Sequence, residues 1–135
     1  MIICEYFGIE ELVPPSVFEA RGHKAWELID PRLVENLDSL RLQLDTPLTI
    51  NNWQWYGSRQ DSGLRLPTSE FWSQFSQHSF GRAADIICGI PAETIREKIR
   101  CKEIILPHPS TYELDVNWLH MDVRNSTDHV SFFHP

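Results

Sequence analysis

The stretch SQHSFGRAADI, residues 76–86, leads from a polar, glycine-containing loop into an apolar segment. Gly81 follows His78 by three residues and permits a sharp turn, because glycine adopts backbone conformations that other residues avoid. The small side chains of Ala83 and Ala84 let other backbone approach closely. We therefore predict a turn that enters a strand over residues 82–87, with Asp85 on that strand and His78 just before it.

A second stretch, NWLHMDVR (residues 117–124), sets a histidine in the middle of an apolar strand. Alternate residues of a strand share a face, so one face of this strand carries Leu119, Met121 and Val123 and belongs to the core. The other face carries Trp118, His120, Asp122 and Arg124. A carboxylate beside His120 can bind a metal itself or hold the imidazole ring as a hydrogen-bond acceptor.

The elements around these two stretches predict an α+β fold. The clearest helix spans residues 30–45, with Asp30 as N-cap, Pro31 in the first turn and leucines spaced on one face. A second helix begins at Pro91, and a short one is capped by Ser69. Further strands are expected at residues 47–53 and 102–106. Since helices and strands do not alternate regularly, we expect a mostly antiparallel sheet with flanking helices.

Length and composition are those of one globular domain over residues 1–135. The net charge of −7 excludes a nucleic-acid partner, which requires clustered cations. No apolar run is long enough to span a membrane, and the N-terminus lacks the basic segment of a secretory signal. We expect synthesis in the cytoplasm without a signal peptide, where the three cysteines stay reduced.

The residue types of the two stretches are those of a metal site. Neutral imidazole and carboxylate are ordinary zinc ligands, and His78, Asp85 and His120 together supply three. Three protein ligands leave a fourth position for water, which is typical of catalytic zinc. The alternative is that these are ordinary satisfied side chains, since the chain has six histidines in all.

The two stretches resemble the signatures of the M15 peptidases, a family of zinc D-Ala-D-Ala carboxypeptidases and phage endolysins. SQHSFGRAAD is similar to the family's SxHxxGxAxD motif, and WLHMDVR to a W-x-H-x-D-x-R ending. The resemblance covers residues 47–124, and the helix over residues 30–45 is similar to the family's leading helix. It implies a hedgehog/DD-peptidase fold, with zinc held by His78, Asp85 and His120.

The resemblance also implies catalytic residues, with one departure from the family pattern. An arginine that holds a substrate carboxylate or polarises the scissile carbonyl corresponds to Arg65, with Arg59 as second choice. A general-base carboxylate three residues before the last histidine is replaced by Asn117, whose amide cannot take a proton. We rank Asp115 first as the replacement base and Glu113 second.

Asp122 ranks third as the base, because orienting a histidine ring is its better role. The function that the resemblance implies is cleavage of peptidoglycan stem peptides by a phage or prophage enzyme, which acts at the cell wall after release or as part of a virion. Carboxypeptidase and endopeptidase action both remain open. The alternatives are a weak or inactive zinc-binding module that contacts other virion proteins, and a metal-dependent hydrolase of another small amide.

Overall fold

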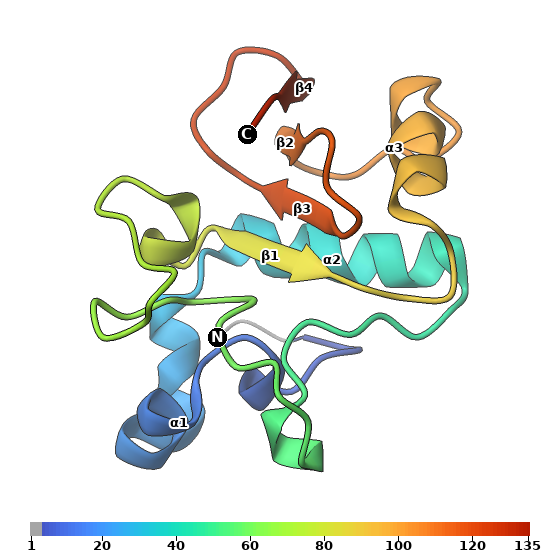
Figure 1. Ribbon diagram of the computed structural model, residues 1–135. Helices are drawn as coiled ribbons and strands as arrows, with labels where there is room; N and C mark the ends of the chain where they lie inside the picture. Colours follow the sequence, from blue (N-terminus) through green and yellow to red (C-terminus); the bar gives the residue numbers. More distant parts are fainter. Residues whose placement is uncertain (1–3) are drawn as a thin grey trace.

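The computed structural model describes residues 4–135 and contains one four-stranded sheet, shown in Figure 1. The strands are β1 (Ala83–Ile86), β2 (Ser110–Glu113), β3 (Leu119–Asp122) and β4 (Val130–Phe133), in the order β1-β3-β2-β4. Both β1 and β2 pair antiparallel with β3, whereas β4 pairs parallel with β2. The predicted α+β class is confirmed.

The prediction of a mostly antiparallel sheet is met only in part, because two strand pairs are antiparallel and the third, β2 with β4, is parallel. The connections of the strands explain this mixed sheet. β3 ends beside the start of β2, because these two neighbours are antiparallel. The chain then passes to the outer edge of β2 through residues 123–129 and enters β4 from the same end. A strand that enters from that end runs parallel to β2.

Within residues 4–135, three α-helices and four short 3-10 helices accompany the sheet. The α-helices are α1 (Pro15–Arg21), α2 (Pro31–Leu44) and α3 (Ala92–Arg100). The 3-10 helices are η1 (Ile9–Glu11), η2 (Gly22–Leu28), η3 (Trp53–Trp55) and η4 (Gln77–Phe80). α2 begins as predicted, because the Asp30 carboxylate accepts the Arg32 N–H at 2.9 Å and Pro31 occupies the first turn.

The apolar face of α2 provides one side of the core. Leu33, Leu37 and Leu40 are fully buried, and they belong to the same cluster as Ile86 of β1 and Met121 of β3. In Figure 1 α2 runs behind β1. At roughly 1.5–3 kcal/mol for each buried aliphatic side chain, this face stabilises the strands that carry the histidine and aspartate.

Several local predictions differ from the structure. Residues 47–53 make a single bridge, between Thr49 and Ile87, and residues 102–106 form a turn and loop, so neither segment is a strand. The segment after Ser69 forms turns instead of a helix and leaves Phe71 and Phe75 exposed. β2 and β4 were not predicted. Within residues 4–135, no helix is long and apolar enough to cross a membrane.

Candidate metal centre

Local sequence fixes the direction of His78. The Ser76 hydroxyl caps η4 by accepting the His78 backbone N–H at 3.3 Å. Gly81 ends η4 with a φ of 69°, and a Cβ there would collide with the Leu28 carbonyl oxygen. The predicted sharp turn at Gly81 is therefore confirmed, and it points His78 inward at the start of β1.

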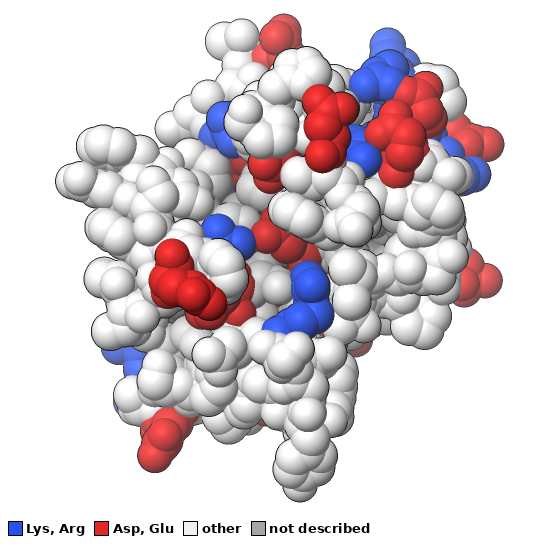
Figure 2. Space-filling view, in the orientation of Figure 1, with Lys and Arg blue, Asp and Glu red and all other residues white. Residues whose placement is uncertain are grey.

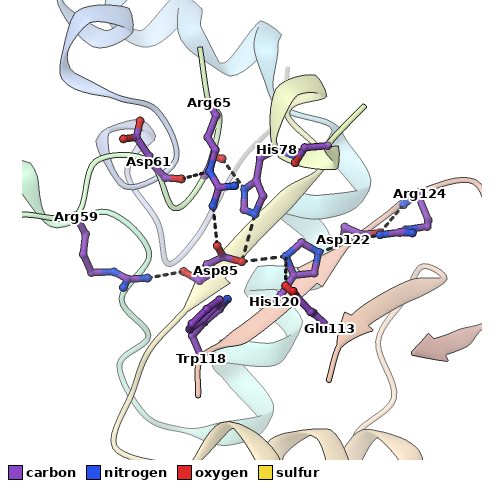
Figure 3. Close-up of polar contacts among 12 residues, drawn as sticks. Arg59, Asp61, Arg65, His78, Asp85, Glu113, Trp118, His120, Asp122 and Arg124 are labelled. Carbon is purple, nitrogen blue, oxygen red and sulfur yellow. Dashed lines mark hydrogen bonds and ion pairs between the residues drawn. The ribbon is translucent and has the colours of Figure 1, made fainter. Parts of the chain in front are cut away.

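Strand register brings Asp85 to His120. Asp85 on β1 lies directly opposite His120 on β3, so both side chains project from the same face. Asp85 Oδ1 lies 2.9 Å from His120 Nδ1 and 3.2 Å from His78 Nε2 (Figure 3). Their exposed fractions are 3% for His78, 8% for Asp85 and 6% for His120, so the cluster is buried.

The outer nitrogens of both imidazoles are held by hydrogen-bond acceptors. His78 Nδ1 lies 2.8 Å from the Gly63 carbonyl oxygen, which can only accept, so this nitrogen carries the proton. His120 Nε2 lies 2.7 Å from Asp122 Oδ2, and Arg124 keeps that carboxylate ionised. A neutral imidazole then has its lone pair on the other nitrogen, so both lone pairs point at Asp85.

Two lone pairs and a carboxylate oxygen can meet stably only around a cation. Without metal the cation is a proton on His120: burial opposes its charge, but Asp122 and Asp85 outweigh burial and raise the pKa of His120 to about 9. Burial by itself would raise the pKa of Asp85, yet its hydrogen bond to the protonated His120 holds it far below its usual range.

A metal ion fits the same position. The three donor atoms all lie within 4.8 Å of one another. Ligands about 2.0–2.1 Å from a tetrahedral ion are separated by about 3.3 Å. The two separations from Asp85, 2.9 and 3.2 Å, are already close to that value. His78, Asp85 and His120 therefore form a group that can hold a metal ion, and among residues 4–135 no other such group is found.

Arg65 and Arg59 both lie beside Asp85, in different roles. Arg65 Nη2 pairs with Asp85 Oδ2 at 2.9 Å, and its Nε donates to the Asp61 carbonyl at 2.7 Å. This contact leaves Oδ1 facing the histidines, so Asp85 would offer a metal ion a single oxygen. Arg59 donates instead to the carbonyls of Ile50 and Asp85, at 2.8 and 3.1 Å, and burial lowers its pKa.

The structure brings Glu113, rather than Asp115, to the cluster. Glu113 is the last residue of β2, and its Oε2 lies 4.0 Å from His120 Nδ1. Asp115 has a φ of 61° in the turn after β2, and its exposed carboxylate pairs with His134. Asn117 is also exposed. Asp122 is fully buried and holds the His120 ring.

Sequence reasoning missed a buried arginine that supports this region. Arg96 of α3 is 3% exposed and donates to the backbone carbonyls of Glu113, Val116 and Trp118, at 3.0–3.3 Å. These carbonyls bound the connection between β2 and β3. One feature of the sequence was a signal for this role. Arg96 lies three residues before Ile99 and next to Ile95, so an arginine falls on the helix face that was expected to be apolar and buried.

Phe133 was also missed as a residue of the site. Its ring meets the His120 ring edge-on, with centroids 5.6 Å apart, and the Arg124 guanidinium lies over the Phe133 ring, 4.7 Å from its centroid. The apolar segment at residues 130–135 gave no sign that it would pair with β2. Gly63 could not be identified either, because it acts through its backbone carbonyl.

The cluster lies on the floor of an open groove. A cavity of about 440 Å³ is lined by His78, Asp85 and His120 together with Glu113, Phe75 and Phe133. A second cavity, of about 320 Å³, begins at Asp85 and extends past Arg59 and Gln60. Figure 2 shows a hollow over β1 and β3 with acidic and basic side chains at its walls. A larger cavity, of about 590 Å³, lies between α3 and the β2–β4 edge and shares none of these residues.

Comparison with known proteins gives no relative of this chain. No protein-family model, curated protein or solved structure matches it. The similarity to M15 peptidases therefore rests on the two motifs alone, and the hedgehog/DD-peptidase fold stays a prediction.

Proposed function

We propose that this chain is a zinc-dependent peptidase that cleaves peptidoglycan stem peptides. The observation that carries the proposal is the convergence of two imidazole lone pairs and one carboxylate oxygen at the floor of an open groove. Buried donors that meet at a solvent-accessible groove are typical of catalytic rather than structural metal sites. The substrate class comes from the two motifs that resemble M15 peptidases.

Each residue of the cluster has a defined part in this proposal. His78, Asp85 and His120 would hold zinc, which when bound would polarise the scissile carbonyl and lower the pKa of a coordinated water towards 7. The acceptors behind the rings, Gly63 and Asp122, hold the proton of each neutral imidazole on its outer nitrogen, which would leave the inner nitrogen to bind the metal.

Glu113 is the proposed general base. Its carboxylate lies at the edge of the cluster, 4.0 Å from His120 Nδ1, and lines the same cavity. It would take the proton of the attacking water, a contribution of about 10²- to 10⁴-fold in rate. Arg65 donates from Nε and Nη2 to Asp61 and Asp85 within the protein. Its remaining nitrogen, Nη1, would stabilise negative charge on the oxygen of the scissile carbonyl.

We also propose an origin in a phage or prophage, with action at the cell wall after release or within a virion. A second candidate function is a zinc-binding module without activity, which contacts other virion proteins. Asn117 favours this second candidate, since it replaces the carboxylate that the family places before the last histidine.

Digestion of purified peptidoglycan by the zinc-loaded protein tests the proposal. We expect release of soluble stem-peptide fragments, loss of that release in His120→Ala, and at least a 100-fold slower rate in Glu113→Gln. His23→Ala, an exposed histidine outside the cluster, is the matched control and should keep full activity. Zinc binding without fragment release by the wild type would support the inactive module instead.

A further inference from the structure

We infer that the groove binds a peptide on both sides of the metal cluster, so that the protein cleaves internal bonds rather than removing a terminal residue. The inference rests on the proposed peptidase function and specifies its substrate. The two motifs leave endopeptidase and carboxypeptidase action equally open, so the choice depends on the shape and charge of the groove.

The first argument is the position of the cluster along the groove. The two cavities meet at Asp85, and both are also lined by Arg65, Phe71 and Trp118. From this junction one arm extends past Ser58, Arg59 and Gln60, and the other past Glu113, Phe133 and Arg124. The cluster therefore lies between two open arms and not at the end of a closed pocket.

The two arms differ in chemistry. The arm toward Ser58 and Gln60 is polar and lies against the loop that follows Trp55. The arm toward Phe133 carries the rings of Phe75 and Phe133 together with the charged side chains of Glu113 and Arg124. A peptide that lies across the cluster would thus meet polar side chains in the first arm and both aromatic and charged side chains in the second.

The second argument is that the arginines of the groove are already engaged. A carboxypeptidase needs a cation that is free to pair with the terminal carboxylate of its substrate. Arg65 uses Nε and Nη2 on Asp61 and Asp85. Arg124 uses the same two nitrogens on Asp122, and each of these two arginines is in an ion pair.

Arg59 completes the set of arginines in the groove. Its Nε and Nη2 hold the carbonyls of Ile50 and Asp85, so they tie β1 to the segment that bridges to it through Thr49 and Ile87. Pairing with a terminal carboxylate would compete with these bonds. None of the three guanidinium groups therefore has a free pair of N–H donors with which to bind the terminal carboxylate of a substrate. This holds even for Arg65 and Arg59, the residues that the resemblance matches to the family's carboxylate-binding arginine.

Two stem pentapeptides that end in D-alanyl-D-alanine, one with a free carboxylate and one with a C-terminal amide, test the inference. We expect the zinc-loaded protein to cut the same internal bond in both, with rates that agree within about threefold, as seen by mass spectrometry. Binding to the Glu113→Gln variant should also be alike for the two peptides. A carboxypeptidase would instead lose about tenfold or more in affinity on amidation, since a charge-assisted pair is lost.

A variant that narrows one arm gives an independent measurement. Ser58→Trp lies in the polar arm alone, and Thr127→Trp, an exposed position outside the groove, is its control. Ser58→Trp should slow internal cleavage at least tenfold and leave zinc affinity unchanged, whereas Thr127→Trp should change neither.

The possible results distinguish failure of the internal-cleavage inference from failure of the proposed peptidase function. Release of terminal alanine from the free acid alone overturns the inference and leaves the peptidase proposal standing. Zinc-loaded protein that neither cuts nor binds either peptide overturns both. An unchanged rate of internal cleavage in Ser58→Trp contradicts the use of the second arm.

Discussion

Replacement of Asp122 by asparagine should weaken zinc binding without unfolding the protein. Asp122 is fully buried, and its Oδ2 accepts from both His120 Nε2 and Arg124 Nη2, each at 2.7 Å. Asparagine offers one acceptor and one donor where the carboxylate offers two acceptors. If the amide nitrogen faces His120, the ring must place its proton on Nδ1, which is the nitrogen that faces the metal position.

If the amide oxygen faces His120 instead, the amide nitrogen meets the Arg124 Nε donor and the carboxylate charge is still lost. Partners behind a metal-binding histidine are worth about 10- to 100-fold in affinity, or roughly 1.4–2.7 kcal/mol. We expect Asp122→Asn to weaken zinc binding by that factor. The Arg124 side chain is 36% exposed, so water can replace part of its lost contact and folding should persist.

The assay is a zinc titration in competition with a chromophoric chelator, beside circular dichroism to verify folding. Asp128→Asn, an exposed aspartate on the way to β4, is the matched control and should bind zinc as the wild type does. A folded Asp122→Asn protein with unchanged zinc affinity would refute the tautomer argument, because the ring would then not need its acceptor.

Three further predictions concern the loop, the cluster's charge and the turn. Arg96→Met should release the β2–β3 connection, so that hydrogen exchange at residues 114–117 rises at least tenfold and Trp118 fluorescence shifts, while Arg96→Lys should retain part of the protection. The metal-free protein should lose on the order of 3 kcal/mol of stability as the pH rises from about 6.5 through 9, because the pKa of His120 is raised to about 9 in the folded state. Urea unfolding at pH 6.5, 8 and 10 measures how the free energy of unfolding changes with pH. The same change in His120→Gln would show that another group causes it. Gly81→Ala should lower the free energy of unfolding by about 1–3 kcal/mol, since its Cβ would meet the Leu28 carbonyl at positive φ; unchanged urea unfolding would contradict this.

Local rules were sufficient to predict α2 and the elements that carry the residues of the cluster. The Asp30–Pro31 start and the leucine spacing located α2, and the apolar alternation around His120 located β3 to within one or two residues at each end. The turn at Gly81 needed only the conformational freedom of glycine. These features depend on residues close in sequence, so periodicity and capping were enough to find them.

Long-range pairing set the limits of prediction. No local signal tells that residues 130–133 will pair with β2, so the mixed sheet and the position of Phe133 could not be anticipated. The choice between Glu113 and Asp115 depends on where β2 ends and the chain turns, and residue spacing does not define that point. The Gly63 acceptor was invisible because backbone carbonyls leave no mark in a sequence.

Zinc stoichiometry tests the central claim most directly. Purified protein, loaded with zinc and freed of excess, should carry one ion per chain by elemental analysis, with imidazole and oxygen donors in its X-ray absorption spectrum. His78→Ala and His120→Ala should each lose the ion, and His23→Ala should keep it. A folded wild-type protein that carries no zinc, or a His78→Ala/His120→Ala double variant that still carries it, would contradict the assignment of the cluster as a metal site.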